Sequence, residues 1–171
     1  GRAFYLAYRQ EGFDKIYVSA LKRTFETVKD FLADGIPYEA LPGLNEISWG
    51  TSEGTEFTSE QNSLYQKLVQ DWQDGKTDRC VEGGESPDQV MVRQQEAFDY
   101  ISGQQNEEKI LICMHGRAMR ILLCWLSNRP LSCMDEYHHD NLGLYILHYD
   151  ESGYSIKTSN DISHLISIRE A

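Results

Sequence analysis

Three polar side chains, each placed where an apolar segment gives way to a turn, could together act on a phosphate group. Arg23 carries a planar fork of N–H donors that matches the geometry of phosphate oxygens. Glu46 can serve as a general acid or base toward a leaving hydroxyl or an attacking water. His115 can donate a hydrogen bond, move a proton or carry a phosphoryl group. Taken singly, each residue also fits an ordinary role, as a solvated charge, a loop carboxylate or a turn histidine.

The stretch of residues 109–126 predicts how His115 is positioned. Residues 110–114 form an apolar run with the length and branching of a buried strand. The apolar spacing then becomes helical, on a face formed by Ala118, Ile121, Leu122, Trp125 and Leu126. His115 and Gly116 lie at the turn between these two elements. Ligands bind at this end of the strands in open α/β sheets, and the amide groups at a helix start favour an anion.

Similar junctions position Arg23 and Glu46. Residues 13–19 predict a short strand, and residues 20–23 lead into a helix that Gly35 and Pro37 end. A short strand is expected at residues 38–41, and the glycine-rich loop that follows contains Glu46. Residues 2–10 are expected to form a helix.

The remaining segments predict a cap and a closing set of elements. Residues 56–72, with Glu56 and Phe57 at their start, predict a helix within a cap-like insertion, called here the cap segment (residues 44–84). Ser86 suits the N-cap of the next helix, Pro87 its first turn, and Gln89 a capping box. We expect a short helix near residues 131–137, strands at 142–149 and 154–158, and an extended tail.

The alternation of strands and helices predicts an α/β fold with a layered core. The length of 171 residues suits one domain, residues 1–171, that includes the cap segment. Arg93, on the helix after Ser86, is expected to be a surface residue.

Composition limits the partners of the chain. Its net charge is −11, and no basic stripe offsets repulsion from a phosphate backbone or an anionic membrane, so neither partner is expected. A small anionic substrate remains compatible where a local cluster of arginine and histidine overrides the overall field. No apolar run approaches the length of a membrane span. A homodimer is compatible with the sequence.

The cysteines and the remaining histidines do not predict a metal site. Four cysteines show no CxxC pair and no regular spacing: Cys80, Cys113, Cys124 and Cys133. Cys113 and Cys124 lie in apolar patterns typical of buried thiols, which favours a reducing cytoplasm over a zinc site. His138, His139 and Asp140 stand together, but adjacent histidines on an irregular segment rarely converge on one ion.

Five segments, in order along nearly the whole chain, resemble the motifs of the histidine phosphatase (phosphoglycerate mutase-like) superfamily. They are IYVSALKRTFET, LNEISWGTSEG, GGESPDQVMVRQQEAF, ILICMHGRAMRILL, and NLGLYILHYD followed by NDISHL. The resemblance implies a three-layer fold with a mostly parallel, mostly six-stranded sheet flanked by helices and an insertion over the active site. It also implies that no metal or other cofactor takes part.

The resemblance further implies a role for each matching residue. In the family, a histidine in an Arg-His-Gly motif on the first strand attacks phosphorus and becomes a phosphohistidine. The residues that match Arg23 and His115 bind the phosphoryl group, and the one that matches Glu46 protonates the leaving oxygen and then activates water. Gly116 and Arg117 match positions whose backbone touches substrate, although turn geometry and a solvent-facing arginine explain them equally well. The family counterpart of Arg93 lies near the interior of the fold, unlike the surface position expected from the local pattern.

The sequence departs from the family at one point, because it contains no Arg-His-Gly. The first strand and its nucleophile are therefore expected to lie outside the residues shown, and the chain alone is not expected to turn over. The expected reaction is hydrolysis of a small phosphorylated metabolite. The segment from Glu46 to Gly84 is shorter than the insertion of the mutase branch of the family, which favours a phosphatase over a mutase. A phosphoglycerate mutase and a noncatalytic scaffold of the same family remain alternatives.

Overall fold

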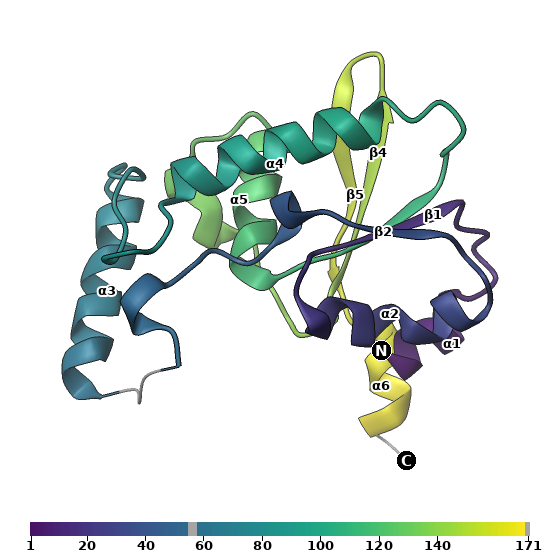
Figure 1. The fold of residues 1–171 in the computed structure, drawn as a ribbon, viewed down its shortest axis with the longest axis horizontal. Helices are drawn as coiled ribbons and strands as arrows, with labels where there is room; N and C mark the ends of the chain where they lie inside the picture. The colour runs from purple at the N-terminus through teal and green to yellow at the C-terminus, as the bar shows by residue number, and fades with distance from the viewer. Residues whose placement is uncertain (55–57, 170–171) are drawn as a thin grey trace.

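The computed structural model describes residues 1–54 and 58–169, and its elements follow the expected alternation of helices and strands (Figure 1). The helices are α1 (Arg2–Tyr8), α2 (Lys22–Ala33), α3 (Ser59–Gln73), α4 (Pro87–Ser102), α5 (Gly116–Leu126) and α6 (Ser163–Arg169). The strands are β1 (Lys15–Val18), β2 (Tyr38–Ala40), β3 (Ile110–Cys113), β4 (Leu144–Asp150) and β5 (Gly153–Asp161). Three short 3₁₀ helices are η1 (Pro42–Leu44), η2 (Gly50–Ser52) and η3 (Leu131–Glu136). Glu56 and Phe57, expected at the start of a helix, lie outside the described residues.

The first three strands form a parallel sheet in the order β2-β1-β3. Val18 at the end of β1 lies opposite Ala40 of β2 and Cys113 of β3. Because parallel strands end at the same edge of a sheet, the loops that follow β1 and β3 meet there. This edge is where the sequence predicted Arg23 and His115 to lie.

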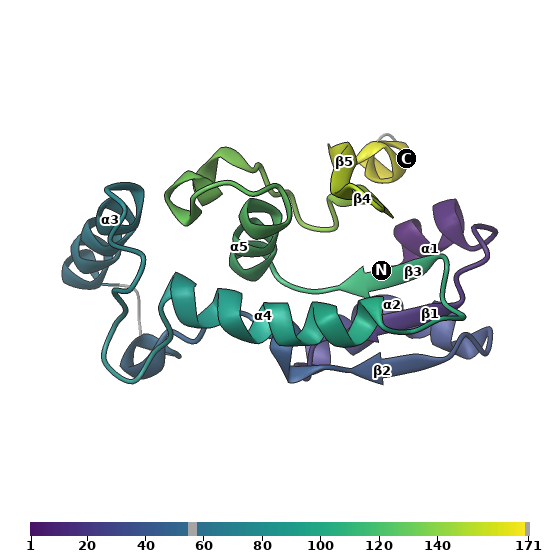
Figure 2. The ribbon, with the colours of Figure 1, turned by 90° about the horizontal axis from the view of Figure 1, so that it is seen from above.

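The last two strands form a separate antiparallel hairpin, which lies beyond β3 (Figure 2). The expected six-stranded sheet is therefore not present among the described residues, which form one sheet of three strands and one of two. The physical reason is that β3 pairs only with β1, and β4 only with β5, so no described strand joins the two sheets. The family's first strand has no counterpart in the part of the chain that the structure describes.

Helices cover both faces of the parallel sheet (Figure 1). Successive side chains of a strand point to opposite faces, and β1 follows this rule. Ile16 and Val18 pack in a core with α1 and α2, whereas Tyr17 packs in a second core with α4 and α5. All three side chains are at most 1% exposed, so the sheet is buried on both sides and the predicted layered core is confirmed.

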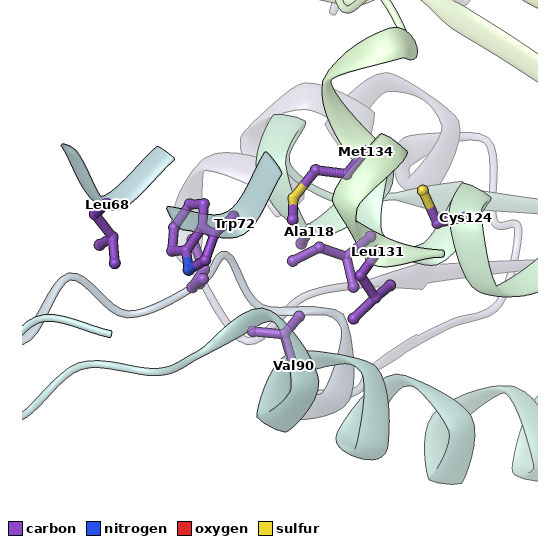
Figure 3. Close-up of a cluster of buried hydrophobic side chains, with 9 residues drawn as sticks. Leu68, Trp72, Val90, Ala118, Cys124, Leu131 and Met134 are labelled. Carbon is purple, nitrogen blue, oxygen red and sulfur yellow. The ribbon is translucent and has the colours of Figure 1, made fainter. Parts of the chain in front are cut away.

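A third buried cluster attaches the cap segment to the rest of the molecule (Figure 3). It joins side chains of α3, α4, α5 and η3, among them Leu68, Trp72, Val90, Ala118, Cys124, Leu131 and Met134. Trp72 of α3 is 1% exposed, and its indole N–H donates to the Arg79 carbonyl at 2.8 Å. The apolar ring and the satisfied N–H fix α3 near the start of α5, which carries the candidate site.

The predicted start of α4 is confirmed in detail. The Ser86 hydroxyl accepts from the Gln89 amide at 3.3 Å, and the Gln89 side chain accepts from the Ser86 amide at 2.9 Å. Pro87 occupies the first turn, where its missing N–H costs no hydrogen bond. The capping box therefore fixes the point at which α4 leaves the cap segment.

The extended tail that the sequence predicted is wrong, because residues 163–169 form α6. The Asp161 carboxylate accepts from the Ser163 amide at 2.8 Å and so satisfies the first amide of the helix. His164 then packs edge-on against Phe4 and Tyr8 of α1, with ring centroids 5.2 and 5.6 Å apart. Packing on α1 thus outweighs the preference of the β-branched residues in this segment for extended chain.

The four cysteines are free thiols. Cys124 is fully buried, as predicted, whereas Cys113 is only partly buried. Burial raises the pKa of each of these two thiols to about 11. Within residues 1–54 and 58–169, no helix combines the length and apolar character needed to cross a bilayer, and no cluster of three or more potential ligands could hold a metal ion.

Candidate functional site

The parallel sheet brings Ser19 and His115 together, although they are 96 residues apart in the chain. Ser19 directly follows β1, and its amide donates to the Cys113 carbonyl at 3.3 Å. His115 follows Met114 after β3 and is the N-cap residue of α5. Both side chains are buried, Ser19 at 2% and His115 at 7% exposure. The site predicted at the carboxyl edge of the sheet therefore has a buried polar floor.

Both ring nitrogens of His115 are hydrogen-bonded. Its Nδ1 lies 2.9 Å from Nε of Arg23, and its Nε2 lies 2.8 Å from the Ser19 hydroxyl. The Arg23 N–H can only donate, so Nδ1 is the acceptor and Nε2 carries the ring proton. The structure thus holds His115 as a neutral imidazole in one defined tautomer.

A pair of hydroxyl groups continues this hydrogen-bond chain. The Ser19 hydroxyl lies 3.0 Å from that of Thr24, which donates to the Leu21 carbonyl at 2.8 Å. With Nε2 of His115 as donor, the chain runs from the ring through both hydroxyls to the carbonyl. Thr24 is as buried as Ser19, at 2% exposure. The two hydroxyls therefore satisfy a buried ring nitrogen that would otherwise lack a partner.

The surroundings lower the pKa of His115 from 6.5 to about 4. Burial is the main cause, because it penalises the charged ring, and the positive charge of Arg23 is the second. Glu46 opposes the shift, whereas Arg93 adds to it. The ring is therefore uncharged near neutral pH while no anion is bound.

Arg23 stands at the start of α2 and is exposed. Its Nε is used by His115, but its two Nη atoms make no hydrogen bond or ion pair with any described residue. The residue also lines a cleft of about 1000 Å³ that opens between the sheet edge and the cap segment. The outer edge of the guanidinium is thus available to an anion in the cleft.

Glu46 lies beside this pair, but its carboxylate is bonded to the start of α5. One oxygen accepts from the amides of Ala118 at 2.8 Å and Ile47 at 3.0 Å, and the other accepts from the Arg117 amide at 3.3 Å. The first amides of a helix favour a negative charge, and Glu46 supplies it. The sequence predicted that the start of α5 would favour an anion, and in this structure the carboxylate of Glu46 occupies that position.

The structure excludes one of the alternatives for Gly116 and Arg117, a solvent-facing arginine, whereas contact of their backbone with substrate stays a prediction. The side chain of Arg117 is only 10% exposed and pairs with Asp135, so it does not face solvent. It also donates to the Tyr65 hydroxyl at 3.1 Å. A Cβ at Gly116 would come within 2.6 Å of the His139 ring, so a larger residue at this position would have to displace that ring. Arg117 thus connects α5 to the cap helix α3.

Arg93 is not the surface residue that the sequence predicted, because its guanidinium holds the Glu46 loop. It forms a two-bond ion pair with Glu85 at 2.8 and 3.0 Å, and it donates to the carbonyls of Gly43 at 2.7 Å and Glu46 at 3.1 Å. Its side chain is 20% exposed. Glu85 also accepts from the Ser48 amide at 2.9 Å, and hydrogen bonds from Arg93 and Ser48 lower its pKa despite partial burial.

The structure brings Arg23, Glu46 and His115 to one edge of the sheet, with Gly116 and Arg117 directly after His115. Sequence reasoning missed the support for these residues, namely Ser19, Thr24, Glu85 and Arg93. The serine and threonine stand within the same motif as Arg23, so their spacing could have indicated them. Nothing in the local pattern around Arg93 reveals its contacts with a loop some 50 residues earlier.

Three known proteins are similar to this chain in sequence or in fold. The chain is 25% identical over 167 residues to a probable phosphoglycerate mutase GpmB of Erwinia tasmaniensis, covering 92% of this chain and 75% of that protein. It is 30% identical over 115 residues to a 6-phosphofructo-2-kinase/fructose-2,6-bisphosphatase of Gallus gallus, covering 67% of this chain but only 23% of that longer protein. The fold is similar to the crystal structure of alpha-ribazole phosphatase from Shigella flexneri. That likeness has a TM-score of 0.79 and 21% identity, and covers 94% of this chain and 79% of the other.

The sequence also matches the family model described as histidine phosphatase superfamily (branch 1) over residues 1–162. This match covers all the elements that build the site, from β1 through α5, and the hairpin beyond them. The chain therefore belongs to the histidine phosphatase superfamily.

Proposed function

We propose that this chain forms the phosphate-binding part of an active site that hydrolyses a small phosphorylated metabolite through a phosphohistidine. The observation that carries the proposal is the contact between Arg23 and His115 at the sheet edge. It fixes Nε of Arg23, a residue that lines the cleft, and leaves both Nη atoms without a partner among the described residues, so that they can hold two phosphate oxygens. Membership of the family supports the same chemistry.

In this proposal, His115 changes its charge when phosphate binds. A phosphate dianion beside Arg23 offsets the positive charge that lowers the pKa of the ring. The ring can then take up a proton on Nδ1, release Nε of Arg23 and donate to the phosphate. The imidazolium and the guanidinium would together neutralise charge that builds on the equatorial oxygens in the transition state.

Glu46 is proposed as the acid that protonates the leaving oxygen and then as the base that activates water, as the family resemblance implies. In this structure its carboxylate accepts three backbone hydrogen bonds from α5 and its own loop. Acting on a substrate would require at least one of these oxygens to turn into the cleft that it lines. The residue therefore has two proposed roles, one in the loop structure and one in proton transfer.

None of the five histidines is proposed as the nucleophile, because the 171 residues contain no Arg-His-Gly. His115 is proposed to bind the phosphoryl group beside the nucleophilic histidine of the Arg-His-Gly motif. Catalysis is accordingly proposed only for a protein in which an Arg-His-Gly segment accompanies this chain. The cytoplasmic location expected from the cysteines and the possibility of a homodimer also stay predictions.

Binding of inorganic phosphate to this chain, measured by isothermal titration calorimetry, tests the proposal without requiring turnover. We expect saturable binding that Arg23→Ala weakens by about tenfold or more, the scale of a lost charge-assisted contact. Lys22→Ala is the matched control, since Lys22 is the neighbouring cation, is exposed and pairs with Glu26. Equal losses in both variants would show that phosphate responds to net charge and not to the site.

The mutase alternative is favoured by one relative, the probable phosphoglycerate mutase. A protein carrying the Arg-His-Gly segment would decide between the two when incubated with 3-phosphoglycerate and a bisphosphate primer. Release of free phosphate supports the phosphatase. Isomerisation without free phosphate would replace it with the mutase. The noncatalytic scaffold would be favoured if another residue replaced the histidine of that segment and if no phosphohistidine formed after exposure to labelled substrate.

A further inference from the structure

The side chain of Arg117 ties the start of α5 to the cap helix α3. The residue directly follows Gly116, with which α5 begins. Its guanidinium donates to the Tyr65 hydroxyl at 3.1 Å and lies over the Trp72 ring at 5.6 Å. Tyr65 and Trp72 are two helical turns apart and therefore stand on one face of α3. Because the Arg117 side chain is only 10% exposed, contacts with protein groups fix its position.

Asp135 of η3 holds this arginine in place. One oxygen of its carboxylate accepts from the guanidinium of Arg117 and from that of Arg120, the latter at 3.0 Å. The other oxygen accepts from the Gln73 side chain, at the end of α3, at 3.4 Å. Two arginines near the start of a helix are disfavoured by the helix dipole and by one another. The Asp135 carboxylate offsets this repulsion and joins α5, η3 and α3.

The backbone of Arg117 contacts the proposed acid and base of the reaction. Its amide donates to one oxygen of Glu46 at 3.3 Å, and the Ala118 amide donates to the other oxygen at 2.8 Å. Trp49, in the same loop as Glu46, packs on the two aromatic rings of α3 with centroid distances of 5.4 and 5.9 Å. The aromatic face of α3 therefore lies against both the Glu46 loop and the start of α5.

From these contacts we infer that Asp135 and Tyr65 are positioning residues for Glu46. They act through Arg117, because they hold its side chain while its amide holds one Glu46 oxygen. That oxygen has a single, longer bond, whereas the other oxygen accepts two bonds at 2.8 and 3.0 Å. The singly held oxygen is accordingly the one that turns into the cleft toward the leaving group. The inference rests on the proposed function, since it assigns the support of the proposed acid.

Hydrogen exchange of the Arg117 amide, followed by nuclear magnetic resonance of the chain, tests this support. Asp135→Asn removes the charge that holds the guanidinium, and exchange at this amide should become about tenfold faster. Tyr65→Phe removes one hydrogen bond and keeps the ring, so the expected increase is about threefold. Glu136→Gln is the matched control, since Glu136 is the neighbouring carboxylate of η3 but pairs with Arg129. Unchanged exchange in the first two variants, or an equal increase in the control, would overturn the inference.

The leaving group of the substrate separates positioning from mere stability. In a protein that carries the Arg-His-Gly segment, kcat/KM is compared for phenyl phosphate, whose leaving oxygen needs a proton, and for 4-nitrophenyl phosphate, whose leaving oxygen needs little help. Asp135→Asn should lower kcat/KM for phenyl phosphate about tenfold more than for 4-nitrophenyl phosphate, and Glu136→Gln should change neither. Equal losses for the two probes in Asp135→Asn would leave Asp135 a structural role only and overturn the inference. Hydrolysis of neither probe by the wild type would instead refute the proposed function.

Discussion

Acidification should destabilise the chain through His115, by an amount that follows from its pKa. The folded state holds this pKa at about 4 and the unfolded chain returns it to about 6.5, so the unfolded state binds more protons between these values. The stability contributed by the neutral ring is complete above pH 6.5 and is lost as pH falls toward 4. A difference of about 2.5 between the two pKa values corresponds to roughly 3 kcal/mol of unfolding free energy, of which about 2 kcal/mol is lost between pH 7 and pH 4.5.

Urea unfolding at a series of pH values, for the wild type and for His115→Gln, isolates this contribution. Burial also lowers the pKa of His164. His164 and the carboxylates titrate in both proteins, so their contributions to the pH dependence cancel in the difference between wild type and variant. We expect the variant to lose about 2 kcal/mol less stability than the wild type between pH 7 and pH 4.5. Parallel pH profiles for the two proteins would refute the reasoning, since they would mean that burial and Arg23 do not hold the ring neutral.

Three further substitutions probe the support of the site. Arg93→Met should cost about 2–3 kcal/mol in urea unfolding, less than for a fully buried pair because both partners are partly exposed, and a loss below about 1 kcal/mol would contradict the role of Arg93. Ser19→Ala leaves a buried ring nitrogen of His115 without its partner, and thermal unfolding should report a loss of about 1–3 kcal/mol, whereas an unchanged midpoint would argue against the hydroxyl chain. Glu46→Gln should destabilise α5 by about 0.5–1 kcal/mol by removing a charge from its start, and a more stable variant would disprove this capping role.

The parts of the fold that depend on local pattern could be predicted from the sequence. The change from a buried run to helical spacing at residues 110–126 predicted β3, the turn at His115 and α5, and the structure has all three. The Ser86 capping box was also predictable, because its partners are three residues apart. Each of these features is determined by neighbours in the chain.

The parts that depend on distant contacts could not be predicted. Arg93 looks like any helix charge until the loop at Gly43 and Glu46 is packed against it. The helix α6 forms because His164 packs on α1, which begins more than 150 residues earlier. The described strands form two separate sheets because of which strands pair with each other. The order of strands and helices along the chain does not determine that pairing.

The central claim is that Arg23 and His115 form a phosphate site, and the titration of His115 tests it most directly. Nuclear magnetic resonance of the ring, followed against pH with and without saturating inorganic phosphate, gives the pKa in each state. We expect a pKa of about 4 without phosphate and a clear rise toward the ordinary value of 6.5 with it. In Arg23→Ala, phosphate should no longer produce that rise. An unchanged pKa of His115 in the wild type at saturating phosphate would show that Arg23 and His115 do not form a phosphate site.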